Sequence, residues 1–219
     1  MRMRRKPYAR PELAACNFYI DRPCEALGKV KDNFKTKNQP LYIELGCGKG
    51  GFIAELASQN PDKNFFGFDI KSEVLVVAKR NIEAVYKAKN LDIDNVIITS
   101  HDIERIDEVL NNADEVSRIY INFCNPWPKT KHHKRRLTHP RQLEKYKTFL
   151  AKDGEIFFKT DDDDLFNASV EYFNEAGFET TFLTRDLHAE NLEDNIVTEH
   201  ENMFSAQGIK IKALRAKVK

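Results

Sequence analysis

The sequence LYIELGCGKGGFIAELASQN occupies residues 41–60 and joins three kinds of segment. Residues 41–46 form a short apolar run that closes on glycines, which is typical of a buried strand. Residues 50–60 then carry apolar side chains at helical spacing and stop before Pro61. A strand, a glycine-rich turn and a helix in immediate succession indicate an α/β fold.

The same alternation continues along the chain. Strands are predicted at 64–70, 95–100, 118–124, 154–160 and 178–184, and the tail 208–218 offers a seventh. Helices are predicted at 72–89, with Ser72 as N-cap, at 140–152 and at 164–177. Strands that alternate with helices predict a mostly parallel sheet with helices on both faces.

Length and composition predict a single globular domain of 219 residues, 41% of them hydrophobic and 32% charged. We expect residues 1–37 to form a basic N-terminal arm and helix, and residues 38–219 to form the main domain. The N-terminus lacks an apolar stretch behind its cations, and no run is long enough to span a membrane. The four cysteines show no C-x-x-C spacing, so neither zinc nor disulfides are expected. These features predict a cytoplasmic protein without a membrane partner.

The net charge of +1 conceals three basic clusters, at residues 2–10, 129–136 and 210–219. Each of these clusters contains five Lys or Arg residues. One such cluster alone is usually a solvated face. Three of them favour a polyanionic partner, because Lys and Arg are the side chains that contact phosphates.

Polar side chains lie at or just beyond the ends of five successive predicted strands. In chain order they are Glu44, Asp69, Asp102, Asn125 and Asp161. Sheets of this kind bind ligands beyond the carboxyl ends of their strands. We therefore expect these side chains to line one site.

The glycine turn matches G-x-G-x-x-G at Gly46, Gly48 and Gly51, which is formally a dinucleotide fingerprint. Glu44 argues against a dinucleotide, because a pyrophosphate on this turn would meet its carboxylate. S-adenosylmethionine carries a sulfonium and an ammonium but no phosphate, so it suits acids beside a glycine turn. Asp69 could then bind the ribose hydroxyls and Asp102 the adenine amino group. The string ELGCGKG is also similar to the first motif of class I methyltransferases.

Residues 122–136, NFCNPWPKTKHHKRR, hold an amide and the only tryptophan between prolines, directly before a basic cluster. A rigid polar and aromatic corner can hold a planar base, and the cations can hold phosphates. Trp127 can either stack on a base or pack the corner, and the sequence leaves both possibilities open.

Over nearly its whole length the chain resembles bacterial tRNA (guanine-N7-)-methyltransferases, the TrmB family. The stretches that carry the resemblance are MRMRRKPYA, IELGCGKGGFI, GFDI, NFCNPWPKTKHHKRRL, GEIFFKTD, RDLHAENLEDNIVTEHE and MFSAQG. The most specific of them is the PWPK-x-x-H-x-KRR block followed by TEHE. The resemblance implies a Rossmann-like class I methyltransferase fold with a seven-stranded sheet. It also implies S-adenosyl-L-methionine as methyl donor and guanosine 46 in the variable loop of tRNA as target.

The resemblance further implies a role for individual residues. Those implied to bind the cofactor are Glu44, Gly46, Gly48, Gly50, Asp69, Asp102 and Asn125. Those implied to bind the substrate are Lys129, Asp161, Thr198, Glu199, His200 and Glu201. Those implied to contact RNA are Lys131, His132, His133, Lys134, Arg135 and Arg136. The chain departs from the family at Asn125, where Asp is usual.

Methyl transfer to guanine N7 requires no general base, because N7 offers a lone pair and carries no proton. The reaction requires alignment of N7, methyl carbon and sulfur, which positioning can supply. Carboxylates near the purine would stabilise the positive charge that develops on it. Asp161 and Glu201 are the candidates for this role and for accepting guanine N1–H and N2–H₂, and Asn125 could orient the base.

Several of these residues also have purely structural interpretations. Thr198 and Glu201 have the spacing of a capping box. In the run DDDD, residues 161–164, three members could cap the following helix rather than bind Mg²⁺. His132 and His133 have no matching ligand pair, so no metal site is predicted.

Other functions remain as alternatives to the hypothesis of a tRNA methyltransferase. The Asn-Pro-aromatic corner resembles that of amino-group methyltransferases acting on adenine N6 or glutamine. A non-catalytic RNA-binding module and a dehydrogenase are further alternatives. The oligomeric state, monomer or homodimer, cannot be read from the chain.

Overall fold

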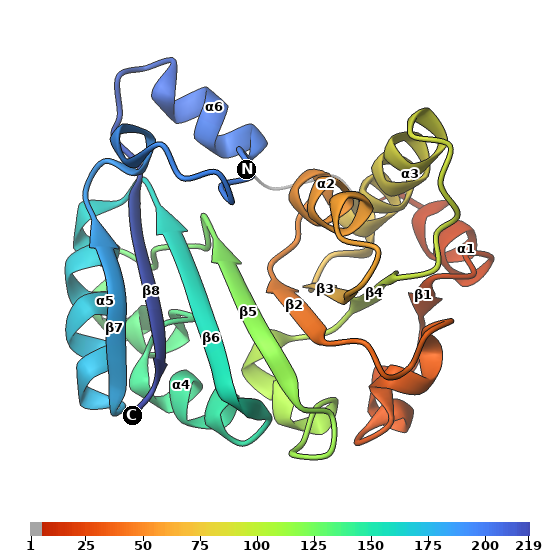
Figure 1. Cartoon of the computed structure of the whole chain (residues 1–219), viewed down its shortest axis with the longest axis horizontal. Coiled ribbons are helices and arrows are strands. Elements are labelled where there is room, and N and C mark those ends of the chain that lie inside the picture. Colours follow the sequence, from red (N-terminus) through yellow and green to blue (C-terminus); the bar gives the residue numbers. More distant parts are fainter. Residues whose placement is uncertain (1–5) are drawn as a thin grey trace.

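The computed structural model describes residues 6–219, which form one twisted sheet with helices on both faces (Figure 1). The strands are β1 (Tyr19–Ile20), β2 (Leu41–Leu45), β3 (Asn64–Asp69), β4 (Val96–Ser100), β5 (Val116–Asn122), β6 (Leu150–Thr160), β7 (Phe178–Thr184) and β8 (Lys212–Val218). Their order is β1-β4-β3-β2-β5-β6-β8-β7, and β8 alone runs in the direction opposite to the other strands. The predicted Rossmann-like, mostly parallel sheet is confirmed.

Within residues 6–219 the sheet has eight strands rather than the predicted seven. The additional strand, β1, is two residues long and pairs with β4 at its outer edge. Thr99 Oγ1 donates a hydrogen bond to Ile20 O at 2.7 Å and helps to hold it there. A strand this short has no periodic pattern that a sequence could reveal.

The helices are α1 (Ala9–Ala14), α2 (Gly51–Gln59), α3 (Ser72–Ala88), α4 (Pro140–Lys147), α5 (Asp163–Glu175) and α6 (Glu199–Ser205). Right-handed crossovers place α2 and α3 on one face of the sheet and α4 and α5 on the other. Figure 1 shows α4 and α5 behind β6, β8 and β7. β3 and β4 are buried and apolar, as expected for parallel strands covered on both faces.

Two predicted helix ends differ from the structure. The N-cap of α3 is Lys71, so Ser72 is the first helical residue rather than the cap. α4 ends at Lys147 because Phe149 turns into the core and β6 begins at Leu150. Packing of one large apolar side chain thus ended a helix that local propensity would have continued.

The N-terminal segment packs along the edge of the sheet as far as it is described. α1 lies against α3, and the 3₁₀ turns η1 (Pro23–Ala26) and η2 (Val30–Asn33) lead into β2. The buried carboxylate of Asp114 accepts backbone hydrogen bonds from Gly28 at 3.1 Å and Val30 at 3.0 Å. Arg2, Arg4 and Arg5 of the predicted basic arm lie outside the described residues.

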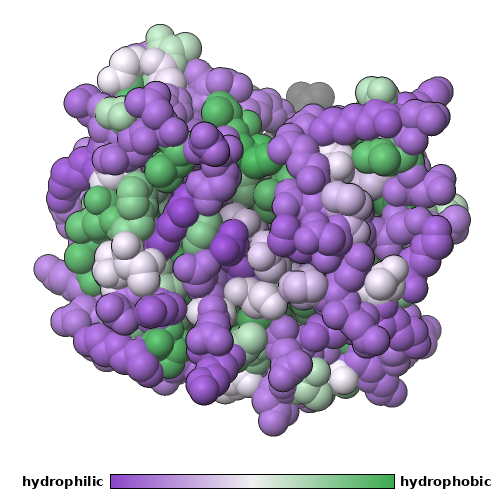
Figure 2. Space-filling model, viewed as in Figure 1, coloured by the Kyte–Doolittle hydropathy of each residue, from purple (hydrophilic) through white to green (hydrophobic). Residues whose placement is uncertain are grey.

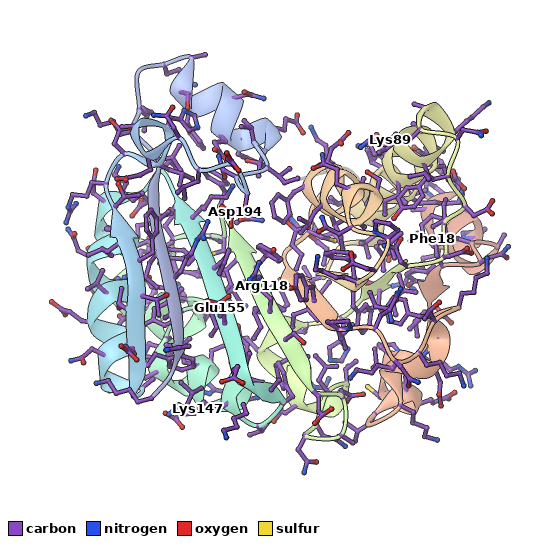
Figure 3. All side chains as sticks on the ribbon, viewed as in Figure 1. Phe18, Lys89, Arg118, Lys147, Glu155 and Asp194 are labelled. Atoms are coloured by element: carbon purple, nitrogen blue, oxygen red, sulfur yellow. The ribbon has the colours of Figure 1, made fainter. Side chains whose placement is uncertain are left out.

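One face of β5, β6 and β8 carries charged and aromatic side chains instead of a helix. Arg118 of β5 and Glu155 of β6 form an ion pair at 2.7 Å (Figure 3), and the Arg118 guanidinium lies 4.1 Å from the centre of the Phe157 ring. Figure 2 shows hydrophobic residues over β7 and also along the upper part of this face, which is otherwise mostly hydrophilic. No helix within residues 6–219 is both long enough and apolar enough to cross a membrane.

Candidate active site at the carboxyl ends of the strands

The turn between β2 and α2 is built on glycines in the left-handed region. Gly46 and Gly50 have φ values of 83° and 73°, a backbone conformation that side chains disfavour. A Cβ on Gly50 would lie 2.8 Å from Ala78 Cβ, so this position also requires close packing on α3. A Cβ on Gly46 would meet nothing within 4 Å. The turn therefore leaves open space beside Gly46, where a ligand can approach the backbone.

Asp69, at the end of β3, is held against this turn. Its Oδ2 accepts a hydrogen bond from the N–H of Gly48 at 3.1 Å, and its Oδ1 accepts one from the N–H of Lys71 at 2.9 Å. Burial raises the pKa of the Asp69 carboxyl, although these backbone donors oppose the shift. Asp102, beyond β4, accepts from Glu104 N at 3.0 Å and so caps the 3₁₀ turn η3 (Ile103–Glu108).

Glu44 is a buried acid with an unused oxygen. Its side chain is 4% exposed, and its Oε1 accepts a hydrogen bond from Asn122 Nδ2 at 3.1 Å. Its Oε2 has no partner within the described chain, and neither has Asn122 Oδ1. Burial raises the pKa of Glu44 to about 7. Buried oxygens are rarely left unpaired, so a ligand that brings hydrogen-bond donors or positive charge fits here.

Lys159, near the end of β6, connects the sheet to the segment before α6. Its ammonium donates to Asn195 Oδ1 at 2.9 Å, Ile196 O at 3.0 Å and Glu201 Oε2 at 2.9 Å. Burial lowers the pKa of Lys159, and the Glu201 carboxylate partly offsets this effect. Lys159 and Asn195 also line a cavity together with Asn122.

Sequence reasoning did not identify Lys159, Asn122 or Asn195 as part of this site. The available signal was a lysine within the apolar strand GEIFFKT, where a charge requires a partner. The partner itself is distant in sequence, so the pattern alone could not supply it.

Glu201 forms a capping box with Thr198, which was the structural alternative to its predicted role in binding guanine. Its N–H donates to Thr198 Oγ1 at 3.0 Å, and its Oε2 accepts from Thr198 N at 3.4 Å. Its Oε1 accepts from Asn195 Nδ2 at 2.9 Å and lies 2.8 Å from His188 Nε2. Burial alone would raise the pKa of Glu201, but Lys159 and these hydrogen bonds hold it below its ordinary value. The Glu201 carboxylate is fully buried, so it presents no free oxygen to guanine.

Glu199 and His200, which were predicted to bind the substrate together with Glu201, point outward from α6. Glu199 is exposed, and its Oε1 accepts from Lys49 Nζ at 2.6 Å, which joins α6 to the glycine turn. The ring of His200 stacks on Phe123 with 5.8 Å between ring centres. The helix is thereby placed beside the turn that would hold a cofactor.

The run DDDD divides into three structural residues and one free residue. Asp162 caps α5 through Leu165 N at 2.7 Å, Asp163 pairs with Lys212 at 3.0 Å, and Asp164 pairs with Arg136. The carboxylate of Asp161 makes no hydrogen bond to any of the described residues, although its backbone oxygen accepts from Lys212. Asp161 is therefore the acid of this run that is available to a substrate.

The Asn-Pro-Trp-Pro corner is an Asx-type turn. Asn125 Oδ1 accepts a hydrogen bond from Trp127 N at 3.0 Å, and Trp127 has a φ of 45°. This contact needs an acceptor oxygen, which either an amide or a carboxylate provides. The Arg135 guanidinium lies 4.2 Å from the centre of the Trp127 ring and covers one side of it.

The predicted RNA-binding strip is divided between surface and core. Lys131 and Lys134 of this strip are exposed, as is the neighbouring Lys129, which was predicted to bind the substrate. Arg135 is bonded to Glu104 at 2.9 Å. Arg136 is only 1% exposed, and its Nε donates to Pro126 O at 2.8 Å. The Arg136 guanidinium therefore braces the corner from beneath, and its predicted contact with RNA stays a prediction.

Comparison with known proteins identifies the family. The model of a family described as "Putative methyltransferase" matches residues 38–214. A tRNA (guanine-N(7)-)-methyltransferase of Clostridium perfringens (strain SM101 / Type A) is 59% identical over 217 residues, which cover 99% of each chain. The protein of the same name from Clostridium beijerinckii is 61% identical over 216 residues, which cover 99% of this chain and 98% of that one.

Solved structures show the same fold at low identity. The 16S rRNA methyltransferase KamB has a TM-score of 0.59 and 14% identity, with 83% of this chain and 88% of that one covered. An antibiotic-related methyltransferase has a TM-score of 0.58 and 18% identity, with 81% and 86% covered. The match in sequence is far closer and runs over nearly the full length of both chains. The chain therefore belongs to the family of bacterial tRNA (guanine-N7-)-methyltransferases.

Proposed function

We propose that this chain transfers a methyl group from S-adenosyl-L-methionine to N7 of guanosine 46 in tRNA. Relatives named tRNA (guanine-N(7)-)-methyltransferase are similar to this chain over nearly its whole length. The observation in the molecule that best supports it is the unpaired, buried Oε2 of Glu44 beside the open glycine turn. A sulfonium donor with an ammonium group matches an acid in that position, and a pyrophosphate does not.

The chain would hold the cofactor at the ends of β2 to β5. The residues proposed for this are Glu44, Gly46, Gly48, Gly50, Asp69, Asp102 and Asn125. The cofactor, when bound, supplies an electrophilic methyl group on a positively charged sulfur. The fixed carboxylate of Asp69 would bind the ribose hydroxyls, and Asp102 would accept from the adenine amino group.

The affinity for S-adenosylmethionine is expected to rise roughly eightfold from about pH 6 to about pH 7.5. The pKa of Glu44 is about 7 in the folded chain, and a cationic ligand favours its ionised form. Isothermal titration calorimetry in buffers of different ionisation enthalpy would measure both the affinity and the accompanying proton release. In Glu44→Gln the release should vanish, leaving only the titration of the ligand itself.

The free chain should show the opposite trend. A carboxyl whose pKa is raised by folding stabilises the fold below its unfolded pKa of about 4.5 and loses that contribution as pH rises through about 7. Urea unfolding of the wild type and Glu44→Gln at several pH values would separate this effect. An identical pH dependence in both would contradict the assignment of the shift to Glu44.

The guanine would be positioned by the free acid and the corner. Asp161 would accept from guanine N1–H and N2–H₂, and its charge would stabilise the positive charge that develops on the purine. Asn125 would orient the base through its remaining amide N–H groups. Glu201, whose carboxylate is committed to the fold, would position Thr198, Glu199 and His200 instead of contacting the base.

The decisive experiment uses methyl-labelled S-adenosylmethionine and unmodified tRNA, followed by identification of the labelled nucleoside. 7-methylguanosine at position 46 is the expected product. 7-deazaguanosine at this position should abolish transfer while binding persists. N6-methyladenosine would favour an amino-group methyltransferase, and absence of label with retained binding would favour a non-catalytic RNA-binding module.

The tRNA backbone would lie along Lys129, Lys131, Lys134 and Arg135. The variant Lys131→Gln/Lys134→Gln should bind tRNA more weakly, and the slope of log affinity against log salt should become shallower by roughly 1.4–1.8. Filter binding at several salt concentrations would measure the slope. Lys87→Gln/Lys152→Gln is a matched control, because both lysines are exposed near the amino ends of the strands. Equal slopes in the two variants would exclude this strip as the phosphate track.

A further inference from the structure

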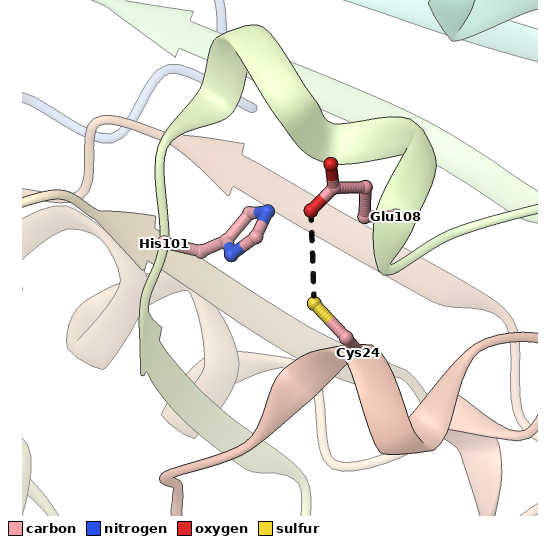
Figure 4. A group of neighbouring side chains, drawn as sticks. All are labelled: Cys24, His101 and Glu108. Carbon is pink, nitrogen blue, oxygen red and sulfur yellow. Dashed lines mark hydrogen bonds between the residues drawn. The ribbon is translucent and has the colours of Figure 1, made fainter.

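Three potential metal ligands from separate segments meet at the edge of the sheet. Cys24 comes from η1, His101 follows β4, and Glu108 ends η3 (Figure 4). One donor atom from each side chain lies within 4.8 Å of the other two, and Cys24 Sγ lies 4.0 Å from Glu108 Oε2. Within residues 6–219 this is the only such group of three His, Cys, Asp or Glu donors.

Two of the three side chains are oriented by a single residue, Arg105. The backbone oxygen of Arg105 lies 3.0 Å from His101 Nε2, so the imidazole carries its proton on Nε2 and keeps a lone pair on Nδ1. The Arg105 guanidinium binds Glu108 Oε1 at 2.8 Å, which leaves Oε2 toward the thiol. Hydrogen bonds of this kind hold the ligands of metal sites in place.

The chemistry of the three donors matches zinc. Thiolate, imidazole and carboxylate are the ligands that Zn²⁺ takes in proteins, and three of them with one water complete a tetrahedral site. Zinc–ligand bonds of about 2.0–2.3 Å require donor atoms roughly 3.3–3.8 Å apart. The side chains would therefore close by about 1 Å, which the exposed Cys24 permits. Mg²⁺ and Ca²⁺ are disfavoured, because they prefer oxygen ligands.

We propose that Cys24, His101 and Glu108 form a binding site for Zn²⁺ that joins the N-terminal segment to the loop after β4. Binding converts the Cys24 thiol to a thiolate, and the proton is released to solvent. The bound ion would fix η1 against η3, directly beside Asp102. This proposal departs from the expectation of no metal site. That expectation rested on the spacing of ligands along the sequence, which does not show that three distant segments meet. The proposal does not depend on the methyltransferase activity.

The test uses the full chain, stripped of metal, and Co²⁺ as a spectroscopic probe. We expect one Co²⁺ per chain, thiolate-to-metal charge-transfer absorption and the strong visible bands of tetrahedral Co²⁺, all displaced by Zn²⁺. Cys24→Ser should remove the charge-transfer band and weaken Zn²⁺ binding by roughly tenfold to a hundredfold. Cys16→Ser is the matched thiol control and should retain the band, because Cys16 is buried elsewhere.

His101→Ala and Glu108→Gln separate a three-ligand site from a lone exposed thiol. Each should weaken Zn²⁺ binding by a factor of the same order as Cys24→Ser, whereas Glu25→Gln, on the same 3₁₀ turn as Cys24, should not. Zn²⁺ should also raise the unfolding temperature of the wild type and slow hydrogen exchange in residues 100–108. Charge-transfer absorption that persists unchanged in His101→Ala and Glu108→Gln, or none in the wild type, would overturn the proposal.

Discussion

Lys159→Met is expected to lower kcat/KM for tRNA methylation on the order of a hundredfold. The substitution removes the ammonium that binds Asn195, Ile196 and Glu201 at once. It leaves the carboxylate of Glu201 buried without its cation, a change that typically costs about 3–5 kcal/mol. The segment before α6 should then separate from the sheet and carry the substrate side of the site with it.

Hydrogen exchange and binding measurements can localise this effect. Exchange should accelerate in residues 186–209, while β2, β3 and the glycine turn remain protected, because local openings need not unfold the core. The affinity for S-adenosylmethionine should change less than kcat. The loss therefore concerns the arrangement of the substrate side more than cofactor binding.

Two further variants serve as controls for Lys159→Met. Lys152→Met removes an exposed lysine from the same strand and should leave both stability and turnover nearly unchanged. Lys159→Met/Glu201→Gln should recover part of the stability, because it removes the uncompensated buried charge. If Lys159→Met behaved like Lys152→Met, the proposed role of Lys159 in positioning α6 would be wrong.

Asp161→Asn is expected to lower kcat for methyl transfer about 10²–10³-fold with little change in stability. The carboxylate of Asp161 makes no hydrogen bond to the described chain, so its charge contributes little to folding. If Asp161 contacts guanine, loss of the charge removes stabilisation that grows as the purine becomes positive. Single-turnover kinetics with saturating S-adenosylmethionine would measure this step directly.

Asp163→Asn provides the comparison for Asp161→Asn within the same acidic run. Asp163 is exposed and pairs with Lys212, so its substitution should affect stability slightly and turnover by less than Asp161→Asn. Equal turnover in the two variants would exclude Asp161 as the group that contacts guanine.

The sheet and the positions of the strand-end acids could be predicted well because their signals are local. The apolar run at 41–46, the glycine turn and the amphipathic helix α2 follow one another without interruption, and each pattern depends only on neighbouring residues. Parallel strands bring their carboxyl ends to one edge, so topology alone predicted where the strand-end acids lie. β1 and the early end of α4 escaped prediction, because pairing with β4 and burial of Phe149 are tertiary contacts.

The candidate site could be predicted by residue type but not by role. Asp161 and Asp162 are adjacent and chemically identical, yet one is free and the other caps α5. Arg135 and Arg136 are equally basic, yet one covers Trp127 at the surface and the other is buried beneath Pro126. Whether a charged side chain faces solvent or the core depends on partners that lie far along the chain.

The amino-acid sequence alone was sufficient to infer the order of strands and helices, the open glycine turn and the row of acids beyond the strands. Only the tertiary structure shows that Glu201 pairs with Lys159 and that Arg136 is bonded to the proline corner. Only the tertiary structure also brings Cys24 beside His101 and Glu108. The physical reason is that backbone conformation responds to neighbouring residues. The state of a buried charge or a ligand cluster depends instead on the electrostatic and hydrogen-bonding environment that distant segments create.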